Sequence, residues 1–184
     1  IFIFDENNIV MKKILKILLA IVAMVLLVMF AIGKKYHFEK SIIINAAPEK
    51  VWGNVNSMKA FNQWNPWLKL DPDMKMEYFG TSGQVGDGYS WDSKIDDAGA
   101  GKQVFTKIYP VKYLTETEIT FFRPFESTAK SNVYLNQEGS GTKVTWTLDT
   151  EMNYPMNLMK FFMDSQMDKS YGEGLVKLKE ISEK

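Results

Sequence analysis

The first pattern along the chain is an uninterrupted apolar run at residues 17–32, inside a longer segment at 14–33. At 1.5 Å rise per residue, about 20 helical residues span roughly 30 Å, the thickness of a bilayer's hydrocarbon core. We therefore predict that residues 11–34 form a single-pass transmembrane anchor. A cleaved signal peptide stays open as an alternative, because lysines precede the run and Ala31-Ile32-Gly33 is a small-x-small site.

The segment before this run and the side of the membrane are less constrained. Residues 1–10 begin without methionine, whereas the MKKILK motif at Met11 is typical of a natural start. We expect residues 1–10 to be a non-native or disordered extension without a structural role. Lysines flank both ends of the apolar run, so the positive-inside rule finds little asymmetry. The side of the soluble part stays open, with an extracytoplasmic position favoured.

Beyond residue 35 the hydrophobic period changes to short alternating runs, which are typical of β-strands. Seven strands are predicted, at residues 36–45, 74–79, 88–95, 102–109, 113–122, 127–136 and 142–152. The connections after the second strand are short or rich in Gly, Asp, Ser and Pro, and no helical pattern separates those strands. The pairing should therefore be antiparallel.

Helical patterns flank these strands. Residues 155–184 carry apolar residues at spacings of three and four, which predicts one long helix. Gly172 and Gly174 inside it cost roughly 1 kcal/mol each against alanine, and close approach of the helix to the sheet would compensate. Two short helices are predicted between the first and second strands, the first beginning at Pro48.

These elements indicate an α+β fold in which a curved, seven-stranded antiparallel sheet surrounds a long carboxy-terminal helix. The two short helices would close one end, and the transmembrane helix would precede the whole. A hydrophobic content of 46% is enough for a packed core of this size.

Composition removes several classes of function. Lysine plus arginine equals aspartate plus glutamate at 22 each, so no basic face for nucleic acid is expected. The chain has no cysteine and a single histidine, His37, which excludes disulfide scaffolds, thiolate nucleophiles and multi-histidine metal sites. Arg123 is the only arginine. We expect neither a metal nor a cofactor.

Several motifs in this order resemble the SRPBCC superfamily, and within it the polyketide cyclase/dehydrase-like, START-related proteins with a helix-grip fold. They are IIINAAPEKVWGNV, FNQWNPW, GDGYSWDS, TKVTWTLD and GEGLVKLKEI. The resemblance covers residues 35–184, which we interpret as one ligand-binding domain. It implies a deep hydrophobic cavity between sheet and helix that holds lipids, sterols, polyketides or other apolar ligands. Only some members of the superfamily are enzymes.

The residues expected to line this cavity are mostly aromatic side chains and methionines. They are Trp64, Trp67, Tyr78, Trp91, Trp146, Leu148, Met159, Phe162, Met163 and Met167. The tryptophans of FNQWNPW have two open interpretations, lining the cavity mouth or fixing the loop to the sheet. Flexible methionine side chains suit a variable ligand, so the methionine-rich half of the long helix should line the cavity while Leu175 and Leu178 pack tightly.

Three hypotheses of function follow. The favoured one is a membrane-tethered, non-enzymatic domain that binds a hydrophobic small molecule or lipid. The second is a cyclase or aromatase, which needs an ionisable group in the cavity, with Glu116, Glu118 and Asp92 as first candidates. For Glu116 and Glu118 an outward position is favoured, because a buried unpaired carboxylate is costly. The third is an envelope domain with a filled interior whose surface binds another protein.

Overall fold

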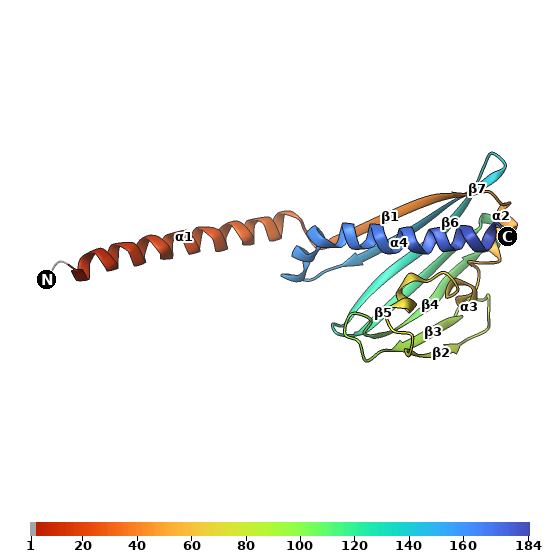
Figure 1. The fold of residues 1–184 in the computed structure, drawn as a ribbon, viewed down its shortest axis with the longest axis horizontal. Coiled ribbons are helices and arrows are strands. Elements are labelled where there is room, and N and C mark those ends of the chain that lie inside the picture. Colours follow the sequence, from red (N-terminus) through yellow and green to blue (C-terminus); the bar gives the residue numbers. More distant parts are fainter. Residues whose placement is uncertain (1–2) are drawn as a thin grey trace.

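The computed structural model describes residues 3–184 and contains one long helix apart from an α+β domain (Figure 1). Helix α1 (Ile3–Ala31) has an apolar stretch at Asn8–Ala31 whose mean hydropathy is 3.0 and which the rest of the chain leaves almost uncovered. This helix is long and apolar enough to cross a membrane. Residues 3–10, expected as an extension, continue α1 as helix, and residues 1–2 lie outside the described part.

The domain is built on one open sheet of seven antiparallel strands, which confirms the predicted number and pairing. The order across the sheet is β1-β7-β6-β5-β4-β3-β2, so the first strand pairs with the last. The strands are β1 (Lys35–Ile44), β2 (Lys75–Phe79), β3 (Gly88–Asp92), β4 (Ala100–Tyr109), β5 (Leu114–Arg123), β6 (Ser127–Glu138) and β7 (Gly141–Glu151). Register shifts in β4 mark irregularities along its pairing with β5.

Helix α4 (Lys160–Ser182) lies along the sheet and is covered on one side by it (Figure 1). A 3₁₀ turn, η3 (Met156–Met159), precedes it, so the α-helix begins five residues after Pro155 rather than at it. Between β1 and β2 lie the short helices α2 (Pro48–Trp52) and α3 (Met58–Phe61) and the 3₁₀ turn η1 (Pro66–Lys69). This is the helix-grip arrangement that the sequence predicted. The short turn η2 (Pro110–Lys112) joins β4 to β5.

A stack of two aromatic rings packs α4 against the inner face of the sheet. The Trp146 ring on β7 lies 3.9 Å from the Tyr171 ring on α4, with 27° between their planes. Both residues are buried, together with Val144 on the same face of β7. Leu175 and Leu178 complete this packing towards the carboxyl end of α4, where both side chains are fully enclosed.

Close approach at this contact depends on Gly174. A Cβ at that position would lie 2.9 Å from the Trp146 ring, 3.2 Å from Pro66 Cδ and 3.3 Å from the Trp64 carbonyl oxygen. The close approach of helix and sheet that we expected to compensate for the low helix propensity of glycine is therefore present at Gly174. At Gly172 a Cβ would meet only the flexible end of Lys40, so that glycine has no comparable packing role.

The two glycines make a matched pair for measurement. We expect Gly174→Ala to lower the free energy of unfolding by about 1–2 kcal/mol, because overpacking outweighs the gain in helix propensity. Gly172→Ala should instead raise it by up to about 1 kcal/mol. Chemical denaturation of both variants checks this, and equal stabilisation by both would contradict the close contact.

Candidate functional site

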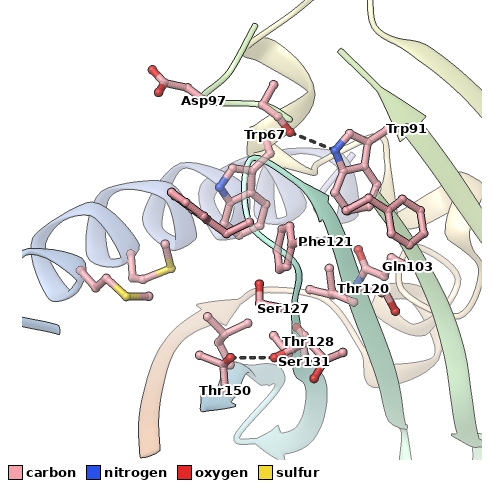
Figure 2. A pocket seen from close by; sticks show the side chains of 18 of the residues that line it. Trp67, Trp91, Asp97, Gln103, Thr120, Phe121, Ser127, Thr128, Ser131 and Thr150 are labelled. Atoms are coloured by element: carbon pink, nitrogen blue, oxygen red, sulfur yellow. Dashed lines mark hydrogen bonds between the residues drawn. The ribbon is translucent and has the colours of Figure 1, made fainter. Parts of the chain in front are cut away.

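A cavity of about 930 Å³ lies between the inner face of the sheet, the η1 turn and the first half of α4. Its lining is largely apolar, with aromatic side chains from β3, β5 and β7 and methionines from α4. Trp67, Trp91 and Phe121 point toward one another across it, with sulfur-bearing side chains projecting from α4 (Figure 2). The volume lies within the range of roughly 300–1,000 Å³ that small-molecule sites occupy.

The segment FNQWNPW forms one wall of this cavity through a side chain that organises its own turn. Asn65 is buried, and its Oδ1 accepts a hydrogen bond of 3.1 Å from the backbone N–H of Trp67. Pro66 then begins η1. This turn directs Trp67 edge-on to both Trp146 and Tyr171, at 5.6 and 5.8 Å between ring centroids. Trp67 therefore lines the cavity.

Trp64 has the other role that the sequence left open. Its indole N–H donates a 2.8 Å hydrogen bond to the Asn54 carbonyl oxygen, and its ring packs against Phe61 and Trp146. It is fully buried and absent from the cavity wall. Trp64 thus fixes the loop to the sheet and does not line this cavity.

Seven of the ten residues predicted from sequence reach the cavity: Trp67, Trp91, Trp146, Leu148, Met159, Met163 and Met167. Besides Trp64, two of the predicted residues lie away from the cavity. Tyr78 lies on the edge strand β2, where its hydroxyl accepts a hydrogen bond from Asn62. Phe162 is 73% exposed on the side of α4 that faces away from the cavity. Helical spacing alone did not show that Met163 faces the cavity while its neighbour Phe162 faces away from it.

The predicted division of α4 agrees with the position of the cavity. Met159, Met163 and Met167 line it, as does Met156 in η3. The cavity ends at Tyr171, beyond which Leu175 and Leu178 are fully buried. Adaptable side chains therefore surround the space, and branched side chains fill the closed end.

A chain of neutral polar groups crosses the floor of the cavity from strand to strand. Asn65 Nδ2 donates to the Tyr89 hydroxyl at 3.1 Å, and this hydroxyl donates to Gln103 Oε1 at 3.3 Å. Gln103 Nε2 donates to Thr117 Oγ1 at 3.0 Å. On the neighbouring strands, the Trp146 indole N–H donates to Ser131 Oγ at 2.8 Å. All of these residues are buried.

This polar chain retains hydrogen-bonding capacity that faces the cavity. Ser131 Oγ accepts a hydrogen bond from the Trp146 indole N–H. Gln103 uses one of its two amide protons on Thr117. Gln103 and Ser131 both line the cavity. The floor can therefore donate to a carbonyl, ether or hydroxyl oxygen of a ligand without placing a charge in the interior.

Within the described part of the chain, the carboxylates that border the cavity lie at its mouth, on Asp97, Glu126 and Glu151, which are all exposed. The carboxylates proposed for catalysis lie elsewhere. Glu116 and Glu118 point from the outer face of β5, and Glu116 pairs with Lys107 at 3.0 Å. Asp92 forms an exposed ion pair with Arg123.

No group of three or more potential metal-ligating side chains occurs among the residues the structure describes.

The sequence reasoning missed Asn65, Tyr89, Gln103 and Ser131. A signal for them exists, because Gln103 and Ser131 occupy inward positions of strands where apolar residues are expected, two residues before Phe105 and Val133. A polar residue on an inward strand position needs a partner, and several such positions in neighbouring strands indicate a polar chain.

Comparison with known proteins agrees with this geometry. The family described as polyketide cyclase / dehydrase and lipid transport matches residues 35–183. Three solved structures share the fold and are each almost fully covered by this chain. Ara h 8.0201 is 15% identical with a TM-score of 0.59, and the match covers 80% of this chain and 97% of that one. TTHA0849 from Thermus thermophilus is 17% identical with a TM-score of 0.58, and the match covers 80% of this chain and 97% of that one. Mll3558 from Rhizobium loti is 16% identical with a TM-score of 0.57, and the match covers 78% of this chain and 96% of that one. No curated protein matches the chain significantly.

The fold and the cavity define a helix-grip domain of the SRPBCC type, and this class is associated with the binding of hydrophobic ligands. The chain belongs to the polyketide cyclase / dehydrase and lipid transport family. At these identities the solved structures establish the fold alone.

Buried tyrosines give the cavity region a testable pH dependence. Burial raises the pKa of the Tyr89 and Tyr171 hydroxyls above the ordinary value of 10.0. The folded state therefore holds these protons more tightly, so their stabilising contribution is complete below pH 10 and is lost as pH rises beyond it. We expect the free energy of unfolding to fall by up to about 1.4 kcal/mol per pH unit for each tyrosine in that range.

Urea denaturation at several pH values between about 9 and 11.5 measures this slope. Tyr89→Phe should reduce it, because one proton fewer is released on unfolding. A slope unchanged by Tyr89→Phe would show that this hydroxyl is accessible to water.

Proposed function

We propose that this protein is a membrane-tethered carrier that holds a neutral hydrophobic small molecule or lipid in the cavity between sheet and α4. The observation that supports it most is the chemistry of the cavity: an apolar wall, a floor of neutral hydrogen-bonding groups, and charged groups at the mouth. Each ligand methylene buried there contributes roughly 0.8 kcal/mol. The polar floor would orient one oxygen-bearing end of the ligand.

The charge pattern favours a neutral ligand over an anionic one. Among the residues that the structure describes, no lysine, arginine or histidine lines the cavity, so nothing there would neutralise a carboxylate or phosphate. The acidic groups at the mouth, Asp97, Glu126 and Glu151, would repel such a group as it entered. Burial of an unpaired charge at the floor would be costly. We therefore expect sterol-like, quinone-like or other neutral amphiphilic ligands rather than free fatty acids.

The enzymatic hypothesis receives less support. A cyclase mechanism of the kind considered requires an acid or base inside the cavity, and the three candidate carboxylates lie outside it. The membrane tether is supported by the length and apolarity of α1.

A cavity-filling variant tests ligand binding. We expect Met163→Trp to weaken binding at least about tenfold, because the larger ring occupies space that ligand methylenes would fill. Met76→Trp on β2 is the matched control, since Met76 does not line the cavity. Native mass spectrometry of the full chain released from detergent micelles measures the bound mass, and displacement of N-phenyl-1-naphthylamine measures affinity.

Two results would contradict the proposal. One is a full chain that carries no small molecule and does not bind the naphthylamine probe. The other is equal probe affinity in Met163→Trp and Met76→Trp, which would place the bound probe outside the cavity.

A further inference from the structure

The carboxyl end of α1 is held by side chains of the domain and is not joined to it through a free linker. Asn157 in η3 is fully buried, and its Nδ2 donates to the carbonyl oxygens of Met29 and Gly33 at 2.7 and 2.9 Å. Lys160 Nζ donates to Ile32 O at 3.2 Å and to Gly33 O at 2.9 Å. These side chains satisfy carbonyls that a helix end leaves without partners, and the Lys160 charge complements the helix dipole.

The same η3 segment borders the mouth of the cavity. Lining residues from η3 and from the connection between β5 and β6 are exposed, so the cavity opens to the surface between these two segments. Both segments lie at the end of the domain that faces α1 (Figure 1). Met156 and Met159 line the cavity from η3, and Phe125 lines it from the β5–β6 connection while 66% exposed. The opening of the cavity is thus fixed in direction relative to α1.

Large apolar side chains gather at this end and are exposed. We name this set the apolar rim: Phe122, Phe125, Tyr154, Met156, Met159, Phe161 and Phe162. Phe161 and Phe162 are 64% and 73% exposed and do not line the cavity, so neither the core nor the ligand site explains them. Exposed aromatic rings next to a membrane-spanning segment are typical of residues that lie at the membrane–water interface.

We infer that the apolar rim is inserted in the membrane interface and that the cavity opens directly into the lipid, so that the ligand exchanges with the bilayer without passing through water. This inference rests on the proposed function, since α1 is taken as the anchor. The capped junction makes the rim continuous with α1. Charges at this end are mixed, with Lys34 and Lys35 at the start of β1 and the carboxylates of Asp97, Glu126 and Glu151 at the cavity, so insertion depends on apolar contact rather than on anionic lipid.

The absence of cysteine allows the rim to be mapped in the full chain with single labels. Phe125→Cys and Phe162→Cys, each carrying an environment-sensitive nitrobenzoxadiazole dye, report on the rim. Val111→Cys, at 95% exposure in the β4–β5 connection at the opposite end of the sheet, is the matched control, and Leu19→Cys reports on α1. The proteins are reconstituted in phosphatidylcholine vesicles with or without lipids that carry a nitroxide near the headgroup.

We expect the labels at 125 and 162 to be quenched by the nitroxide lipid and to be several-fold less sensitive to aqueous iodide than the label at 111. The inference is overturned if iodide quenches the labels at 125 and 162 as strongly as the label at 111 while the label of Leu19→Cys remains in lipid. Protection from iodide without nitroxide quenching also overturns it, because a protein partner or a second copy would then cover the rim.

Ligand exchange provides a second readout that leaves the cavity intact. The double variant Phe161→Glu/Phe162→Glu should load ligand from vesicles about tenfold more slowly, because charge replaces two interfacial rings, while its final occupancy is unchanged. Val111→Glu should load at the normal rate. Occupancy is measured in the same samples by native mass spectrometry. If the cavity holds ligand at normal occupancy but the rim labels lie in water, this inference alone is overturned. If the cavity is empty but the rim labels lie in lipid, the proposed function alone is overturned.

Discussion

The stack of Trp146 on Tyr171 marks the tightly packed end of the space between α4 and the sheet, and the cavity lies on its amino-terminal side. At Gly174 the helix backbone approaches the Trp146 ring as closely as a residue without a Cβ permits. Further towards the amino end, the helix changes to methionines that line an open space. The cavity therefore begins on the amino-terminal side of this tight contact.

The neutral polar floor depends on the same contact. Trp146 faces the cavity with its ring and donates its indole N–H to Ser131, so one residue both stacks on α4 and orders the polar groups beneath the ligand. Asn65 has a similar double role, because it shapes the turn before Trp67 and donates to Tyr89. Buried polar networks of this kind favour one arrangement of the core, since any shift leaves a donor or acceptor without its partner.

The sequence predicted the architecture well because strand alternation and helical spacing are local patterns that burial enforces. In β7, Val144, Trp146 and Leu148 share the inner face, as their alternation with polar residues indicates.

The site was harder to predict. Trp64 and Trp67 are chemically alike and three residues apart, yet one is fixed in the core and the other faces the cavity, because the Asn65 turn rotates the chain between them. Phe162 is as apolar as Met163, and only the helix's rotation against the sheet, which tertiary packing sets, decides which of them faces inward. The polar floor required knowledge of the strand order, since its members come from segments far apart in the sequence and meet only through sheet register.

The capped junction has a consequence for how the chain matures. The small residues Ala31 and Gly33 lie at the end of α1, where the carbonyl oxygens of Ile32 and Gly33 are engaged by Lys160 and Asn157. A peptidase needs an extended, accessible backbone, and this segment offers one only before the domain folds around it. A cut after Gly33 would remove the carbonyl oxygens of Met29 and Gly33 to which the buried Asn157 amide donates, so the folded junction disfavours separation of α1 from the domain.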